Sequence, residues 1–394
     1  MPPPPDEPGD GPGGTRPPFR EVIRYFLGLG TWGFGGPIAT VGYMQRDLVA
    51  GRRWVGERDF LNGVALGQTM PGPLAAQVVM WVGFLEKGAL GALATAVAFI
   101  FPSFVVVLAV AVLYVRFQGL EVVQALFYGI APAVMAVIAL AAVRLARLTN
   151  RTDPRLWVIS AITLVVTAVT GAEIAWLFVG AGLVMVLWEA PPRFLRRRAR
   201  LPAVVPWPMI AVLSADLSAA TLVALSLFFL KAGAFIFGSG LAIVPFLREG
   251  VVAQHHWLTE RQFLDSVAMG LITPGPVVIT ATFIGYLVAG PVGAVVASVA
   301  IFLPIYLGVV VPGPWFVRRQ DRPWLIAFVK GATAAAAGAI GGATIVLARG
   351  AIVDWATAGL ALAALPFVLV FKNKEPVLVL LAALGGIALH PLSG

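Results

Sequence analysis

The stretch W-V-G-E-R-D-F-L-N-G-V-A-L-G-Q-T-M-P-G-P at residues 54–73 decides the fold, because it occurs twice. Residues 257–276 read W-L-T-E-R-Q-F-L-D-S-V-A-M-G-L-I-T-P-G-P, and the two stretches are identical at 11 of 20 positions. Ordinary residue frequencies would give about one or two matches by chance. The same offset of 203 residues pairs Gly30 with Gly233. The chain is therefore an internal duplication, and the fold has to consist of two related halves.

Composition places both halves in a membrane. Hydrophobic residues make up 59% of the 394 positions and charged residues 12%, with a mean hydropathy of +0.90. A soluble domain carries about 25% charged residues, so this chain lacks the charge to cover a soluble surface. Its apolar stretches have the length of membrane-crossing helices, without the alternation of barrel strands. We expect an all-α polytopic membrane protein.

Charge and the rarer residue types exclude several classes of site. The net charge of +9 would suggest nucleic acid in a soluble protein, but the arginines cluster between apolar segments, where they act as topology signals. We therefore expect no nucleic-acid partner. The chain has no cysteine and three histidines, so we expect neither a metal site nor a cofactor. An enzyme would need a nucleophile and base, paired acids or a metal cluster, and the sequence shows none of these.

The two halves contain the same series of apolar segments. In the first half, a broken stretch at 22–49 precedes short segments at 57–70 and 73–85, followed by spans at 88–115, 120–143, 156–171 and 173–189. In the second half, the corresponding segments lie at 217–247, 260–273, 276–288, 291–312, 323–348, 351–371 and 375–391. Each short segment measures about 20 Å, less than the roughly 30 Å hydrocarbon core. We interpret each pair as a re-entrant helical hairpin, with one kinked helix as the alternative.

The basic loops predict that the two halves face opposite ways. The loop at 144–155 carries four arginines and should be cytoplasmic, whereas its counterpart near Arg349 has one basic residue. We therefore expect inverted-topology repeats with about ten crossings and two re-entrant hairpins. If the first broken stretch is itself re-entrant, the first half has four crossings and the N-terminus moves inside. The expected organisation is a disordered tail at 1–18, repeats at 19–190 and 216–394, and a basic cytoplasmic linker at 191–215.

Inverted repeats with interrupted helices are typical of secondary transporters, which bind substrate where the repeats meet. A half-helix that begins after a Pro-Gly-Pro break presents free N–H groups and a positive dipole end, which suit an anion. We therefore expect an oxyanion pocket at the breaks. For each polar residue there, a helix-packing hydrogen bond is the alternative, and for Lys231 it is snorkelling to the interface. The candidate binding residues are Gly35, Gly36, Thr69, Gly72, Gln77, Gly238, Ser239, Gly240, Thr273, Gly275, Thr280 and Lys231.

A second group of residues is expected to shape or gate the hairpins. The two acid–arginine pairs should cap the hairpin helices and pair locally, since an acid suits the first turn of a helix. Arg46 and Arg248 end the broken segments and suit helix C-termini, with anion steering as the alternative. The gating and structural candidates are Glu57, Arg58, Pro71, Pro73, Glu260, Arg261, Pro274 and Pro276.

Several ordered motifs resemble the chromate ion transporter family, in the long form that has both halves in one chain. They are F-G-G-P at 34–37, R-R-W-x-x-E at 52–57, P-G-P at 71–73 and F-G-S-G-L-A-I-V-P at 237–245, continuing through W-L-T-E at 257–260 to T-P-G-P at 273–276. The resemblance covers about residues 19–390. The family often has a histidine just after F-G-G-P-x-A, where this chain has Thr40.

The resemblance implies a transporter in the bacterial plasma membrane that exports chromate, a tetrahedral dianion, and confers chromate resistance. Sulfate would be the related or competing anion. Export could be driven by the membrane potential or by proton exchange. The alternatives are uptake of sulfate or another oxyanion, and a passive anion channel. The expected partners are the anion and the lipid bilayer, with a homodimer left open.

Overall fold

The computed structural model describes residues 17–33, 36–117, 121–170, 175–190, 217–234, 243–319, 322–371 and 375–389, and every regular element in these ranges is helical. The first half contains α1 (Phe19–Trp32), α2 (Gly36–Met44), the π-helix η1 (Gln45–Gly51), α3 (Glu57–Thr69), α4 (Leu74–Phe117), α5 (Glu121–Asn150), α6 (Pro154–Thr170) and α7 (Ala175–Glu189). The second contains α8 (Leu217–Ala234), α9 (Ile243–Arg248), the π-helix η4 (Glu249–Gln254), α10 (Glu260–Ile272), the 3₁₀ turn η5 (Val277–Ile279), α11 (Thr280–Val310), α12 (Gly313–Val317), α13 (Pro323–Ala351), α14 (Trp355–Val370) and α15 (Glu375–Leu389). The expected all-α class is confirmed.

The duplication extends to single backbone dihedrals. Arg53 and His256 occupy equivalent positions after the two π-helices, and each has a φ of 52°, which is unusual for a residue with a side chain. Gly88 and Gly290 have φ values of 59° and 61° and interrupt α4 and α11 at equivalent points. The two halves therefore share their turns and kinks as well as their sequence pattern.

The interruption at Lys87 and Gly88 separates two parts of α4 with different roles. Residues before it form the second arm of the first hairpin, opposite α3, and residues after it form a long apolar segment. The sequence placed the boundary between its segments 73–85 and 88–115 at this point. Glycine is needed there because a left-handed φ costs other L-residues about 1–2 kcal/mol.

Helix α5 differs from its predicted extent. The sequence ended this span at residue 143 and assigned 144–155 to a basic loop, but the helix continues to Asn150. Arg144 therefore lies on the helix, and its Nη2 donates to the carbonyl oxygen of Val368 on α14 at 3.0 Å. The buried Asn150 closes the corner by donating to Ser160 on α6 at 2.9 Å. Arg144 is thus accommodated within the helix, because its guanidinium has a hydrogen-bond partner on the other half.

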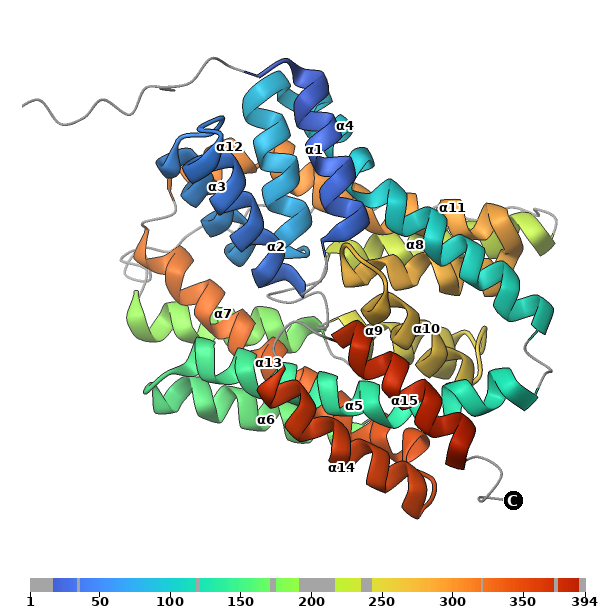
Figure 1. Cartoon of the computed structure of the whole chain (residues 1–394). Helices are drawn as coiled ribbons and strands as arrows, with labels where there is room; N and C mark the ends of the chain where they lie inside the picture. The colour runs from blue at the N-terminus through green and yellow to red at the C-terminus, as the bar shows by residue number, and fades with distance from the viewer. Residues whose placement is uncertain are drawn as a thin grey trace, which may run out of the picture.

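The helices form two bundles, and each half contributes to both (Figure 1). Helices α1 to α4 pack with α8, α11 and α12 in one bundle, with α4 and α11 in contact at its centre. Helices α5, α6 and α7 pack with α13, α14 and α15 in the other. Helix α10 contacts elements of both bundles. The two halves are therefore interlocked.

Small residues allow close helix packing, as is usual in membrane bundles. On α13, Gly331 lies against the carbonyl of Ala181 on α7, and Gly338 against the carbonyl of Ser160 on α6. A methyl group at either position would collide with backbone. The apolar outer faces, in contrast, are exposed on α4, α6, α14 and α15, as lipid-facing surface should be.

Four helical segments of the described chain are long and apolar enough to cross a membrane, and they form two equivalent pairs. They are Leu74–Phe117 with Val277–Val310, and Gln124–Asn150 with Pro323–Ala351. Five shorter apolar helices accompany them. The chain is thus a polytopic helical membrane protein. The ten crossings and the opposite orientation of the halves stay predictions.

Candidate functional site

Each Pro-Gly-Pro break packs against the long helix of the opposite half. Ser103 on α4 donates a hydrogen bond to the carbonyl oxygen of Pro274, and a Cβ added to Gly275 would collide with its Oγ. A Cβ added to Gly72 would lie 3.0 Å from Cγ2 of Ile305 on α11. Ser103 and Ile305 are equivalent positions of the repeat. Each break is therefore held by the long helix of the other half, at the centre of the first bundle.

The breaks need glycine at their centres for two reasons. Gly72 has a φ of 140° and Gly275 a φ of 98°, conformations that residues with a side chain rarely adopt. Both also lie too close to neighbouring atoms to accept a methyl group without a shift. The flanking Pro73 and Pro276 have no N–H to leave unpaired at the start of the following helix.

The first turn of α4 is enclosed. Leu74, Ala75, Ala76 and Gln77 are all buried, and the N–H of Gln77 is the first to bond back, to the carbonyl of Pro73 at 3.1 Å. The preceding N–H groups of the turn have no partner within the helix. A buried helix start of this kind is suited to an anion.

Gln77 braces the break from inside. Its Nε2 donates to the carbonyl oxygens of Pro71 at 2.8 Å and Met70 at 3.4 Å, while its buried Oε1 has no hydrogen-bond partner. The amide donor is thus engaged by the backbone. The free oxygen is an acceptor, which suits a water molecule or a protonated oxyanion better than a fully ionised one.

The second break is arranged differently. The Thr273 hydroxyl donates to the carbonyl of Met269 at 2.9 Å, and the buried Thr280, at the position equivalent to Gln77, donates to Val277 at 2.8 Å. Both hydroxyls are satisfied by carbonyl groups of their own segment. Their oxygens still have acceptor capacity.

The remaining binding candidates are only partly placed. Gly36 begins α2, beside the first break in the chain. Lys231 is exposed near the end of α8, and its Nζ is 5.6 Å from the centre of the Phe246 ring. Within the part of the chain that the structure describes, no contact joins it to a Pro-Gly-Pro break. Gly35, Gly238, Ser239, Gly240 and the side chain of Thr69 lie outside the described residues.

The acid–arginine pairs do not pair locally as expected. Glu260 accepts from Nε of Arg248 at 2.7 Å, and Arg261 instead reaches the carbonyl of Gln124 on α5 at 3.3 Å. Helix α10 is capped by Thr259, which forms a reciprocal capping box with Gln262. The sequence missed this because Arg248 and Gln124 approach α10 only in the folded chain.

The acid–arginine pair of the first half is exposed. Glu57 and Arg58 lie in the first turn of α3, which begins after Gly56 without a side-chain cap. The position equivalent to Arg248 is Gln45, so Glu57 has no corresponding arginine. The ion pair is therefore a feature of the second half.

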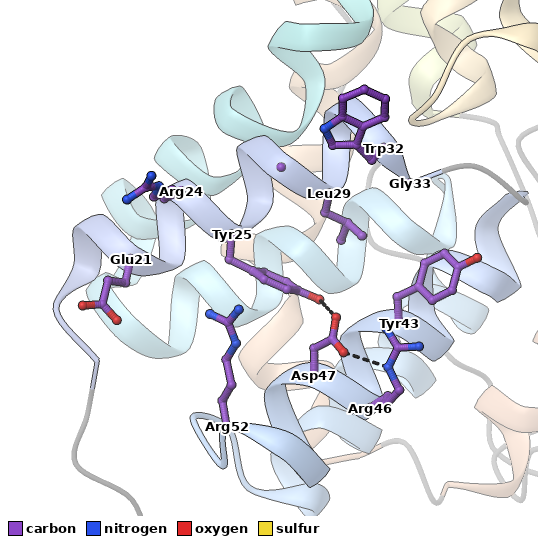
Figure 2. A pocket seen from close by; sticks show the side chains of 11 residues that line it. Glu21, Arg24, Tyr25, Leu29, Trp32, Gly33, Tyr43, Arg46, Asp47 and Arg52 are labelled. Atoms are coloured by element: carbon purple, nitrogen blue, oxygen red, sulfur yellow. Dashed lines mark hydrogen bonds and ion pairs between the residues drawn. The ribbon is translucent and has the colours of Figure 1, made fainter.

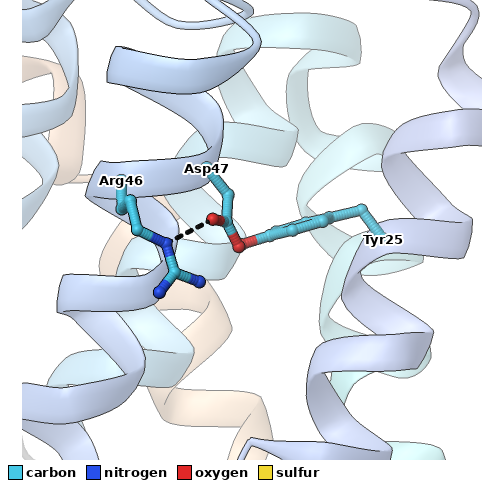
Figure 3. Close-up of polar contacts among 3 residues, drawn as sticks. All are labelled: Tyr25, Arg46 and Asp47. Carbon is cyan, nitrogen blue, oxygen red and sulfur yellow. Dashed lines mark hydrogen bonds and ion pairs between the residues drawn. The ribbon is translucent and has the colours of Figure 1, made fainter.

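A cavity of about 520 Å³ opens beside the first broken segment, between α1 and η1 (Figure 2). Its walls carry three arginines and two acids, which leaves one net positive charge. In its lining, Asp47 accepts from Nε of Arg46 at 2.8 Å and from the Tyr25 hydroxyl at 3.3 Å (Figure 3). The charged lining residues are Glu21, Arg24, Arg46, Asp47 and Arg52.

Aromatic rings orient the cavity arginines. The Arg52 guanidinium lies 5.2 Å from the centre of the Tyr25 ring and 4.6 Å from that of Trp54, and Arg46 lies 5.5 Å from the Tyr43 ring. Stacking of this kind holds a guanidinium in place and leaves its N–H edge free for an anion. Arg46 was a candidate for anion steering from the sequence, whereas Tyr25 and Asp47 were not among the predicted residues.

The equivalent region of the second half is filled. Phe228 replaces Tyr25 and Phe246 replaces Tyr43, and their rings stack with centroids 5.4 Å apart. Gly250 replaces Asp47, and the Phe228 ring occupies the space next to it. Among the described residues, the charged cavity of the first half is therefore not repeated in the second.

The fold and the paired breaks define a polytopic membrane protein built from two repeats with interrupted helices. The chain belongs to the chromate transporter family, whose profile matches residues 20–186 and again residues 223–387. This is a family of transporters and not of enzymes. The two matched regions coincide with the halves found by the internal repeat.

Individual relatives cover nearly the whole chain. A chromate transport protein of Cupriavidus metallidurans is 48% identical over 99% of this chain and 98% of its own length. A probable chromate transport protein of Synechococcus elongatus is 45% identical over 94% of this chain and 95% of its own length. A chromate transport protein of Pseudomonas aeruginosa is 31% identical over 93% and 91% of the two chains. No solved structure matches.

Proposed function

We propose that this chain is a secondary transporter that exports chromate across the bacterial plasma membrane and so confers chromate resistance. The proposal is supported by family membership and by near full-length relatives that are named for chromate transport. Sulfate, a tetrahedral dianion of similar shape, is the expected competitor.

The main support for the proposed site is that each Pro-Gly-Pro break packs against the long helix of the opposite half. Because the first turn of α4 is buried and lies beside the break that Ile305 of α11 touches, its free N–H groups point into protein. A dianion there would gain the helix-dipole attraction in a water-poor setting, where electrostatic attraction is strong. We place the substrate between the two breaks.

The charged cavity would serve as the entrance for the anion. Exposed arginines concentrate anions locally and raise the rate of encounter, without needing to bind them tightly. Since Asp47 already neutralises part of the charge of Arg46, the cavity would hold a dianion weakly enough to release it.

Energetics favour export over uptake. With the cell interior negative, each negative charge that moves outward gains about 2.3 kcal/mol per 100 mV, and a dianion gains about twice that. Export can therefore be driven by the potential alone or with proton exchange. Uptake of sulfate would need a coupled ion, and a passive channel would need no alternation between the two halves.

Purified protein in proteoliposomes tests the function directly. A potassium diffusion potential should drive chromate toward the positive compartment, and added sulfate should compete. Reversing the potential should reverse the flux. A protein that moves no chromate under any potential or pH gradient would refute the proposal. Chromate flux that never saturates with concentration would indicate a passive channel instead.

A further inference from the structure

A buried acid lies on the helix of the second hairpin that leads into the second break, and it does not line the charged cavity. Asp265 on α10 is 2% exposed, and its Oδ2 accepts a hydrogen bond of 2.7 Å from the hydroxyl of Tyr114 on α4. The contact joins the two halves over 151 residues of chain. Within the described chain, the three ion pairs involve other acids. A buried carboxylate with one hydrogen-bond donor and no ion pair is costly to keep ionised.

The surroundings of this contact are apolar. The Tyr114 ring packs edge-on against Phe127 of α5 and Phe283 of α11, with centroids 5.4 Å and 5.2 Å away. Four helices meet here, from both bundles. The position is therefore one where a change of charge would act on the contact between the bundles.

Other charges near α10 lie toward its first turn. Arg261 is exposed one turn before Asp265 and binds the carbonyl of Gln124 on α5. Glu260 is paired with Arg248 of α9, and Arg349 is exposed at the end of α13. Around the Asp265 carboxyl itself, the Tyr114 hydroxyl is the hydrogen-bond donor, and Arg261 one turn earlier supplies a positive charge on the same helix. Asp265 follows the first residue of α10 by about 7.5 Å along the helix axis. That first turn carries the exposed Arg261, and it is the end of α10 from which a proton would have to enter.

The other half lacks this arrangement. The position equivalent to Asp265 is Asn62 on α3, and the position equivalent to Tyr114 is the buried Phe316 on α12. Asn is similar in shape to Asp, and Phe to Tyr, but at this position only the second half has a carboxyl group. Because Asn and Phe fill the equivalent positions, packing alone does not require an acid here. A buried ionisable residue in a membrane protein is a functional candidate.

We propose that Asp265 is the proton-binding group of the transport cycle: its carboxyl is neutral while the dianion occupies the breaks, and it ionises after the anion has left. The inference rests on the proposed function and specifies its coupling. An ionised carboxylate on α10, the helix that leads into Pro274-Gly275-Pro276, would repel a dianion bound at that break. Binding of the proton and binding of the anion therefore favour each other. The proton then travels outward with the anion, which is symport and takes the place of the proton exchange considered above. Each cycle moves one net negative charge instead of two, and the membrane potential still drives that charge outward.

The test uses Asp265→Asn in proteoliposomes at zero potential, with both compartments kept above the pH at which chromate itself takes up a proton. In the wild type, a pH gradient should drive chromate from the acidic to the alkaline side. In Asp265→Asn, this flux should fall to background, whereas chromate–sulfate exchange at equal pH continues. Gradient-driven flux that is equal in both proteins would overturn the proposal, as would wild-type flux from the alkaline to the acidic side.

Two further measurements keep the result interpretable. Asn at position 265 reproduces what the first half has at Asn62, so the variant should fold. Tyr114→Phe, which copies Phe316, should keep the gradient-driven flux but move its pH midpoint upward, because the carboxylate loses its donor. The infrared band of a protonated carboxyl should titrate in the wild type and vanish in Asp265→Asn. Absence of that band would refute the role of Asp265, whereas wild-type protein that shows the band but moves no chromate would refute the proposed function alone.

Discussion

Ser103 of the first half donates a hydrogen bond to the carbonyl oxygen of Pro274 in the second half, at the point where α4 passes the second Pro-Gly-Pro break. The bond spans 171 residues of chain and is buried. Ile305 makes the equivalent approach to Gly72 without a hydrogen bond. The two breaks are thus fixed to the opposite repeat by different chemistry, polar on one side and apolar on the other.

Ser103→Ala should weaken the second break. The substitution leaves the carbonyl of Pro274 without this donor, at a cost of about 0.6–1.5 kcal/mol in a membrane protein. We expect a lower thermal midpoint and slower chromate flux, with membrane insertion unchanged. Thr31→Ala is the control, because the Thr31 hydroxyl donates to the carbonyl of Leu27 on its own helix. Equal flux in Ser103→Ala and wild type would show that the break does not need this contact.

Alanine at the four left-handed glycines separates backbone strain from contact. Gly72→Ala and Gly275→Ala introduce both strain and a collision, whereas Gly88→Ala and Gly290→Ala introduce strain into open space. Strain alone should cost about 1–2 kcal/mol in each variant. We expect the first pair to abolish chromate resistance in a sensitive bacterium and the second pair to reduce it modestly. Equal loss in all four, at equal insertion, would remove the breaks from the substrate path.

Arg52→Gln should raise the chromate concentration at half-maximal flux several-fold, with little effect on the maximal flux, because the cavity is proposed to gather anions. The difference from wild type should shrink at high salt, which screens exposed charges. Arg319→Gln is matched, since Arg319 also lies over an aromatic ring, that of Trp315 at 4.7 Å, but outside the cavity. An equal effect of both substitutions would mean that only overall charge matters.

Glu260→Gln should destabilise the protein more than Glu57→Gln does. Glu260 loses its partly buried ion pair with Arg248, worth about 1 kcal/mol, whereas Glu57 is exposed and has Gln45 in place of that arginine. The comparison is made by thermal unfolding in detergent. Equal midpoints for the two variants would indicate that the Arg248 pair adds nothing measurable to stability.

Asp354 should confer acid sensitivity on the start of α14. The backbone N–H of Thr357 and the Tyr128 hydroxyl, which both donate to its carboxylate, lower the pKa of Asp354 from 3.8. The stabilisation is therefore complete above the ordinary pKa and is lost as the pH falls through the lowered one. Asp354→Ser keeps a helix cap without a titrating group, so the gap in thermal midpoint between wild type and variant should close on acidification. A gap that is independent of pH would contradict this role.

Much of the fold could be read from local patterns. The repeat at 54–73 and 257–276 gave the two halves, and the Pro-Gly-Pro strings gave the breaks, because proline and glycine act on the backbone where they stand. The boundary at Gly88 was visible for the same reason. The end of α5 was predicted too early, because an arginine does not end a helix when its guanidinium has a hydrogen-bond partner.

The sequence by itself determined that this is a duplicated, helical membrane protein with two glycine-centred breaks, since composition, period and backbone chemistry are local properties. The tertiary structure decided which side chains come into contact. It brought Ser103 to Pro274 and Tyr114 to Asp265, and it left a charged cavity beside Tyr25 while Phe228 filled the equivalent space. These contacts join positions far apart in the chain, and side chains on interlocked halves acquire partners only when the helices pack.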